Sequence, residues 1–139
     1  SSDFPSVIEK LGEHRLRYAY AWKTLLEAGL HCNGGSDAPI EQVNPFLGIY
    51  SAVTRRSFID GICYMPEERL TIYEAVSLFT TGSAYAIGKE AKRGQIAKGY
   101  EADFTILDRN IFEIEAEEIK EVQAEMTVID GQVVYRKDA

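Results

Sequence analysis

Apolar residues in the first third of the chain follow first a helical and then an extended pattern. From residue 11 to residue 28 they recur at helical spacing and would form one face of a helix. That face comprises Leu11, Tyr18, Trp22, Leu25 and Leu26. Gly29 then has the character of a helix C-terminus. The next segment, 30–34, has small or apolar residues at alternate positions, which predicts a buried strand that ends in a loop at 36–39.

Two later helices are predicted from their capping residues. Asn44 is a favourable N-cap and Pro45 suits the first helical position, so the apolar stripe after them indicates a helix that ends near residues 55–56. Thr71 and Glu74 have the spacing of a capping box and predict a third helix. We expect its buried face to contain Ile72, Ala75, Val76 and Phe79.

After Gly88 the pattern changes from a helical period to a period of two. The elements that it predicts are strands at 94–96 and 102–107, an acidic helix at 116–122, and strands at 126–129 and 133–135. Asp130 and Gly131 join the last two strands. This pair favours a hairpin, because the turn needs positive φ and glycine adopts it at little cost. The order of elements is therefore helix, strand, helices and a small antiparallel sheet.

The composition is that of one folded domain. The chain has 139 residues, of which 45% are hydrophobic, and this is enough for a hydrophobic core. Its net charge of −7 leaves no basic stripe for nucleic acid or an anionic membrane. Cys32 and Cys63 form no CxxC pair, and neither a long apolar run nor a signal-peptide pattern is found. We therefore expect a cytoplasmic protein without nucleic-acid or membrane partners.

Three stretches of the sequence carry a family resemblance. They are Gly35-Ser36-Asp37-Ala38-Pro39 with 44–55, then 70–75 with 80–86, and finally 94–104 with 128–135. Together and in this order they resemble the amidohydrolase superfamily, in particular its YtcJ-like branch of metal-dependent hydrolases. The resemblance covers nearly the whole chain.

The resemblance implies an α/β fold. In this family the catalytic domain is a (β/α)₈ (TIM) barrel, and segments before and after the barrel build a small β-domain. Residues 1–90 would be the C-terminal part of the barrel, with 30–34 as its last strand. Residues 91–139 would be the C-terminal part of the small β-domain, a β-sandwich segment. Asp37 would then follow the end of the eighth strand, where barrel active sites lie.

The resemblance also implies the chemistry. Asp37 would be the catalytic general base and proton shuttle of a hydrolase that cleaves non-peptide carbon–nitrogen bonds of a small-molecule substrate, and it would also bind the divalent metal, for which we expect zinc. The other ligands of the family come from earlier strands. Of the two histidines, His14 and His31, neither belongs to an HxH or HExxH spacing. We therefore expect no tightly bound metal and no activity in this chain alone, and a complete site in a longer parent.

Simpler interpretations exist for each of these residues. Without the family pattern, Asp37 is a loop or N-cap aspartate beside a proline. We expect His14 and His31 at the surface, and Trp22 in the core together with Tyr18 and Tyr20. Arg55 and Arg56 suit the negative end of a helix dipole. The acidic run 113–121 is predicted to be an exposed face.

Two further expectations concern partners. Part of a barrel leaves strand edges and apolar faces uncovered, so we expect a homo-oligomer. The alternative function is that of a free-standing, non-catalytic module whose sheet, 94–135, binds a partner.

Overall fold

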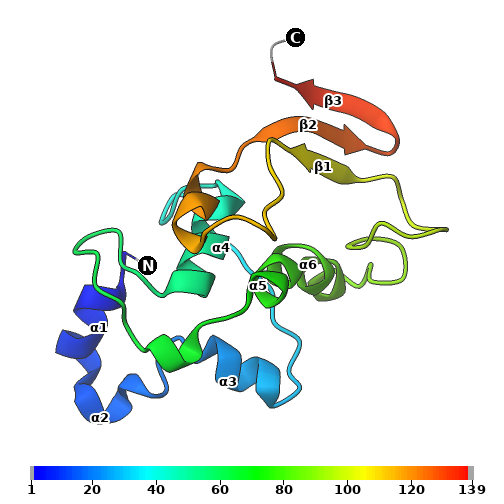
Figure 1. Ribbon diagram of the computed structural model, residues 1–139. Helices are drawn as coiled ribbons and strands as arrows, with labels where there is room; N and C mark the ends of the chain where they lie inside the picture. The colour runs from blue at the N-terminus through cyan, green and yellow to red at the C-terminus, as the bar shows by residue number, and fades with distance from the viewer. Residues whose placement is uncertain (1, 138–139) are drawn as a thin grey trace.

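Helices dominate the chain up to residue 90, and the strands follow (Figure 1). The computed structural model describes residues 2–137, so residues 1, 138 and 139 of the two predicted domains lie outside it. The helices are α1 (Phe4–Leu11), α2 (Glu13–Leu16), α3 (Trp22–Glu27), α4 (Pro45–Thr54), α5 (Ile72–Phe79) and α6 (Thr81–Ala86), with 3-10 helices η1 (Pro66–Glu68) and η2 (Ala116–Glu121). The strands are β1 (Phe104–Leu107), β2 (Ala124–Ile129) and β3 (Gln132–Arg136). None of these helices is long and apolar enough to cross a membrane.

The predicted helix over 11–28 is wrong, because the chain forms short helices there. Gly12 has φ +71° after α1, and Tyr20 has φ +53° before α3. Tertiary contacts override the helical pattern, since the rings of Tyr20 and Trp22 pack on Phe4 at centroid distances of 5.3 and 6.2 Å. Tyr18, expected in the core, is 70% exposed.

The predicted strands at 30–34 and 94–96 are not formed. Within residues 2–137, no strand lies beside the segment 30–34, and its Gly34 N–H donates to the Leu78 carbonyl at 3.0 Å. A strand is stabilised by its neighbours' backbone groups, so an alternating pattern without a neighbour remains only an extended segment. Ile96 lies in a loop and is 90% exposed.

The caps predicted for α4 and α5 are confirmed. Asn44 Oδ1 accepts a hydrogen bond from Phe46 N at 3.0 Å. Thr71 Oγ1 accepts from Glu74 N at 3.2 Å, and Glu74 Oε2 accepts from Thr71 N at 2.7 Å. Each bond satisfies an N–H that the helix itself leaves without a partner, which is why these helix starts could be predicted locally.

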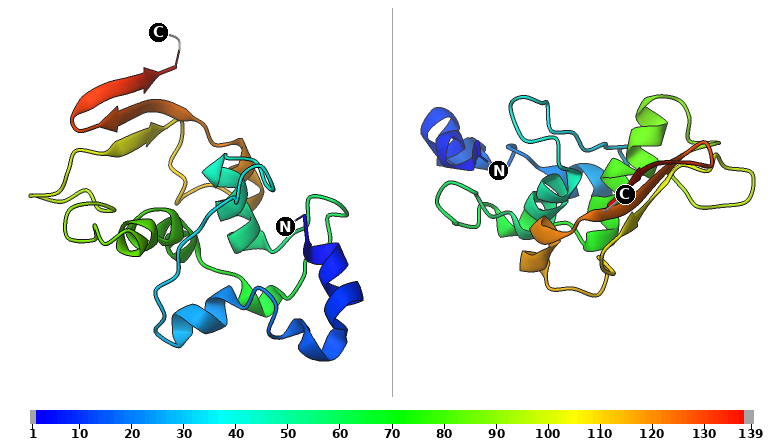
Figure 2. Two further views of the ribbon diagram at one scale, coloured as in Figure 1. Left: turned by 180° about the vertical axis from the view of Figure 1, so that it is seen from behind. Right: turned by 90° about the horizontal axis from the view of Figure 1, so that it is seen from above.

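The core is built around α4 and α5, and η2 with its flanking residues covers it (Figure 2). Its buried members are Ile49, Tyr50, Ala52, Leu70, Ala75, Leu78, Ile111, Ile119 and Val122. The core thus takes residues from both sides of the predicted boundary at 90/91, and the division into two domains stays a prediction.

A three-stranded antiparallel sheet, in the order β1-β2-β3, ends the chain. Asp130 and Gly131, with φ +50° and +72°, form the predicted hairpin turn. Within 102–107 only Phe104–Leu107 is a strand, and the predicted acidic helix is the 3-10 helix η2. All five residues of β3 are exposed.

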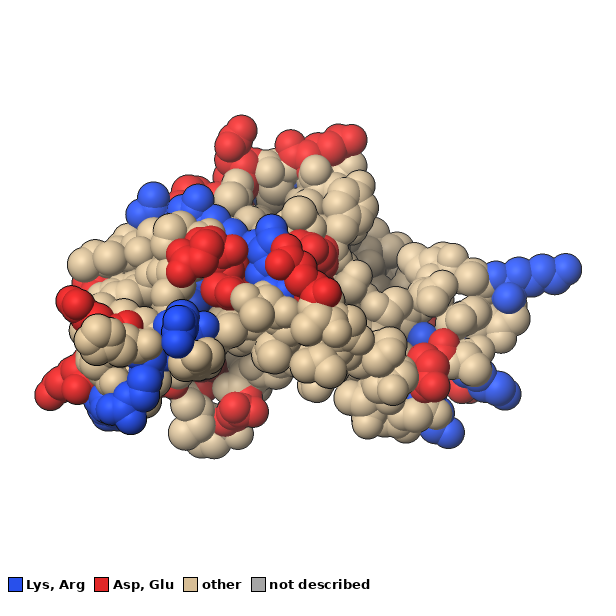
Figure 3. Space-filling view, turned by 90° about the horizontal axis from the view of Figure 1, so that it is seen from below, with Lys and Arg blue, Asp and Glu red and all other residues tan. Residues whose placement is uncertain are grey.

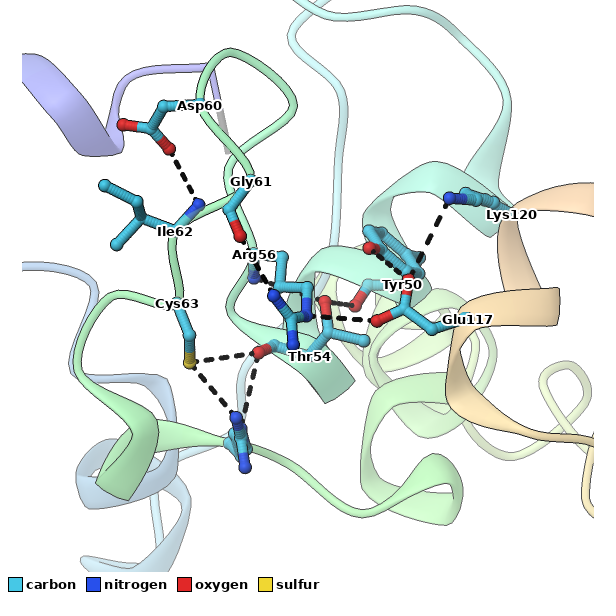
Figure 4. Close-up of polar contacts among 10 residues, drawn as sticks. Tyr50, Thr54, Arg56, Asp60, Gly61, Ile62, Cys63, Glu117 and Lys120 are labelled. Atoms are coloured by element: carbon cyan, nitrogen blue, oxygen red, sulfur yellow. Dashed lines mark hydrogen bonds and ion pairs between the residues drawn. The ribbon is translucent and has the colours of Figure 1, made fainter.

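Glu117 of η2 connects the C-terminal part of the chain to α4 (Figure 4). Its carboxylate accepts a hydrogen bond from Tyr50 Oη at 2.8 Å and pairs with Arg56 Nε at 3.0 Å. Burial, followed by Glu117, raises the pKa of Tyr50. One carboxylate of the acidic run therefore has a structural role, although it is exposed as predicted.

Glu68 is a buried carboxylate that joins η1 to α3. Its Oε2 accepts from Thr24 N at 3.0 Å, and its Oε1 accepts from the Thr24 hydroxyl. Burial raises the pKa of Glu68, but the bonds from Thr24 lower it, and the net result is a pKa below the ordinary value of 4.5.

We therefore expect Glu68 to stabilise the fold in a pH-dependent way. A carboxyl group with a lowered folded-state pKa contributes stability above its unfolded-state pKa and loses it as the pH falls through the folded-state value. The gap in unfolding free energy between the wild type and Glu68→Gln should thus be largest near neutral pH and shrink below about pH 4.3. Urea unfolding at several pH values, followed by Trp22 fluorescence, measures it. An equal gap at neutral and acidic pH would contradict this role.

Candidate active site

Asp37 lies in the turn that follows the extended segment 30–34. Its φ is +50°, and the turn is held by hydrogen bonds from Ile40 N to the Asp37 carbonyl and from Glu41 N to the Ser36 carbonyl. The side chain is exposed. No hydrogen bond or ion pair engages its carboxylate within residues 2–137, so this group is free to accept a proton or a ligand.

The Asp37 cleft is a cavity of about 630 Å³. Side chains from the N-terminal segment, the turn, α4 and α5 line it. Its aromatic lining residues are Tyr20, Trp22, Phe58 and Phe79. Asp3 and Glu41 are acidic groups at the same cavity. The cleft therefore combines an aromatic wall with carboxylates.

Tyr20 and Glu41 are held by neighbours of the N-terminal segment. Tyr20 Oη donates to Asp3 Oδ2 at 3.3 Å, and the pKa of Tyr20 is raised by burial and then by Asp3. The Ser2 hydroxyl donates to Glu41 and lowers its pKa. At neutral pH the cleft thus presents the protonated phenol of Tyr20 and the ionised carboxylate of Glu41.

Arg55 supports the aromatic wall through its contacts with Trp22 and Tyr20, and no pattern in the sequence indicated this role. Its side chain is fully buried, and its guanidinium lies over the rings of both Phe4 and Trp22, at 4.6 and 4.4 Å from their centroids. Its guanidinium donates to the carbonyls of Tyr20 and Tyr64, both at 3.1 Å. Burial lowers the pKa of Arg55. Its predicted place at the helix end is confirmed, but only Arg56 is exposed there.

The two histidines lie away from the cleft. His14 is exposed in α2, as predicted for a surface residue. His31 is also exposed, and its ring stacks on Tyr85 at a centroid distance of 3.9 Å. Among residues 2–137 no three His, Cys, Asp or Glu side chains come together to hold a metal ion. Asp37 fits the role of one oxygen ligand, but a catalytic metal site typically has three protein ligands.

Solved structures similar to this chain include metal-dependent hydrolases. An uncharacterized metal-dependent hydrolase from Pyrococcus horikoshii OT3 superposes with a TM-score of 0.72, covering 84% of this chain and 24% of its own, at 27% sequence identity. Another, from Pyrococcus furiosus, has a TM-score of 0.62, covering 78% of this chain and 23% of its own, at 31% identity. The chain therefore has a mixed α/β fold similar to part of these hydrolases.

Sequence relatives agree with this similarity. The Bacillus subtilis (strain 168) protein YtcJ, which its name places among the amidohydrolases, is 51% identical over 99% of this chain and 26% of its own length. The N-substituted formamide deformylase of Arthrobacter pascens is 30% identical over 83% of this chain and 21% of its own length. This chain thus spans about a quarter of the length of such relatives. Since residues 2–135 also match the amidohydrolase family, the chain belongs to that family, as its three sequence stretches indicated.

Proposed function

We propose that this chain is the C-terminal part of a metal-dependent amidohydrolase that cleaves a non-peptide carbon–nitrogen bond in a small molecule. The observation that carries the proposal is the free carboxylate of Asp37 among the residues that line a cavity, in a chain of the amidohydrolase family. The Arthrobacter pascens relative, whose name describes it as a deformylase of N-substituted formamides, supports a carbon–nitrogen bond as the target.

Asp37 is the general base and proton shuttle in this proposal. A divalent metal, for which we propose zinc, lowers the pKa of bound water towards ~7 when it is present. The Asp37 carboxylate accepts the proton of the attacking water and returns it to the leaving nitrogen, which would otherwise depart as an unstable anion. Asp37 also supplies one metal ligand. The other ligands come from chain outside these 139 residues, so the chain alone is inactive.

The proposed barrel follows from the same assignment. The extended segment 30–34 would be the last strand of the barrel, paired with strands of the longer protein. Its backbone is available for this, because Gly34 N is the one amide of 31–34 with a backbone partner inside residues 2–137. Residues 1–90 would complete the barrel, and 91–139 would form part of a small β-sandwich.

Exposed apolar side chains support the expected association. In the view from below, a broad uncharged area lies between the charged groups (Figure 3). The residues Ile40, Val43, Ile59, Ile62 and Ile96 are all more than half exposed. Exposed apolar side chains favour a covering partner, and we propose that the rest of the barrel covers some of them and that, in the assembled cytoplasmic enzyme, a further copy covers others.

The test compares this chain with the longer protein of which it would be a part. We expect the longer protein to retain divalent metal at one or more ions per chain after gel filtration, and to release amine from an N-substituted formamide. We expect the 139-residue chain to do neither. Elemental analysis and amine detection measure both. A longer protein without metal and without hydrolysis would overturn the proposal, and so would tight stoichiometric metal on this chain.

A further inference from the structure

The ring of Phe79 occupies a notch between two glycines. A Cβ atom placed on Gly34 would lie 2.6 Å from Phe79 Cε2 and Cζ, and one on Gly48 would lie 2.6 Å from Cζ. Contacts of this kind below 3.0 Å essentially do not occur. The ring therefore fills the space that the two missing side chains leave open.

The notch lies at the cleft of Asp37. Gly34 ends the extended segment before the Asp37 turn, Gly48 belongs to α4, and Phe79 ends α5. All three residues line the cavity, and the Phe79 side chain is only half-buried. The Phe79 ring packs against the backbone at Gly34 and Gly48 on one side and borders the cavity on the other. Close packing restricts its movement, so it forms a fixed part of the cavity wall.

The other residues that line the cavity indicate which kind of ligand group it can accept. Tyr20, Trp22 and Phe58 supply apolar surface, whereas the charged lining residues are all acidic. No lysine or arginine among the described residues lines the cavity, so nothing there compensates an anionic group. The lining therefore disfavours an anion, and the amide of the proposed function, with an apolar substituent against the aromatic residues, is compatible with it.

We propose that Phe79 is a specificity-determining residue: it sets the depth of the Asp37 cleft and limits the size of the apolar group that the cleft accepts beside Asp37. The proposal rests on the proposed function. The Phe79 ring can occupy its position only because Gly34 and Gly48 have no Cβ atom. The residues at 34, 48 and 79 therefore determine the position of the ring together. A smaller residue at 79 deepens the cleft, and a side chain at 34 or 48 drives the ring into it.

Trp22 is the single tryptophan and lines the cleft, so its indole N–H signal in an NMR spectrum of the 139-residue chain reports binding. The probes are benzamide and 4-butylbenzamide, two neutral amides that differ in length. We expect wild type to prefer benzamide, and Phe79→Ala to shift the ratio of the two Kd values by at least about tenfold towards 4-butylbenzamide, as for a few methylenes in an apolar pocket. Phe79→Leu should shift it in the same direction by less.

Glycine variants provide matched tests. Gly34→Ala and Gly48→Ala should raise the Kd of both probes by about tenfold or more, since the displaced Phe79 ring takes up cleft volume. Gly35→Ala is the control, because a Cβ there meets nothing closer than 4.0 Å. Neither Gly34 nor Gly48 has a positive φ, so alanine causes no backbone strain at either position.

An unchanged Kd ratio in both Phe79 variants, with a dispersed spectrum that shows a folded chain, would overturn the proposal. Absence of binding of either probe to wild type would also overturn it. These measurements need no metal and no turnover. A failure of the hydrolase proposal would instead appear as missing hydrolysis in the longer protein, so the two failures are distinguishable.

Discussion

Replacing Asp37 by asparagine in the proposed longer amidohydrolase should lower kcat by about 10²–10⁴-fold, the range that general acid–base catalysis contributes. The amide keeps the size of the side chain but cannot accept the proton of the attacking water. Since the Asp37 side chain is exposed and has no partner among residues 2–137, the exchange should leave the free energy of unfolding nearly unchanged. Steady-state kinetics with an N-substituted formamide, together with urea unfolding of the same variant, separate the two effects.

Asp3→Asn is the matched control for this experiment. Asp3 lines the same cleft and loses the same charge on substitution, but its carboxylate is engaged by the Tyr20 hydroxyl. If only the negative potential of the cleft mattered, the two variants would lose similar activity. We expect Asp3→Asn to lose less than about tenfold, short of a general base's contribution. An Asp37→Asn enzyme within a few-fold of wild type would refute the assigned role.

Arg55→Met should be the most destabilising of these substitutions in the chain itself, by about 2–5 kcal/mol. The change leaves the carbonyls of Tyr20 and Tyr64 without their buried donor, and each such loss costs about 1–3 kcal/mol. It also removes the cation that lies over the rings of Phe4 and Trp22, a contact worth about 2 kcal/mol when desolvated. These losses sum to about 4–8 kcal/mol. Methionine restores part of the apolar contact and removes a buried cation whose desolvation costs free energy, so the expected net loss is smaller, about 2–5 kcal/mol.

Arg56→Met is the control, because this neighbour has the same chemistry at the surface. Its ion pair with Glu117 is about half exposed on both sides, so its loss should cost less than about 1 kcal/mol. Urea unfolding followed by the fluorescence of Trp22 and by circular dichroism measures both variants. Equal losses for the two arginines would show that burial of Arg55 is not what stabilises this region.

Loss of Arg55 should also disturb the cleft, through the backbone. Arg55, Tyr20 and Met65 all have left-handed φ values, between +50° and +59°, and the Arg55 side chain contacts the other two residues. Such conformations persist only where the surrounding structure holds them. The aromatic wall beside Asp37 is therefore held by a residue that lies outside the cavity.

The sequence by itself determined the elements whose signals are local. The caps at Asn44 and Thr71 and the turn at Asp130-Gly131 each act within a few residues, so their positions were predicted correctly. The motif around Asp37 likewise indicated the family, and the family match agrees with it. These features need no distant partner to be recognised.

Only the tertiary structure decided which residues surround Asp37. The two adjacent arginines look alike in the sequence, yet Arg55 is buried because Phe4 and Trp22 arrive from a segment more than 30 positions away. That packing also divides the helical pattern at 11–28. The strand predicted at 30–34 is not formed, because its alternating pattern has no neighbouring strand to pair with among the described residues. Local free energies are small beside long-range packing, so distant contacts decide wherever the two compete.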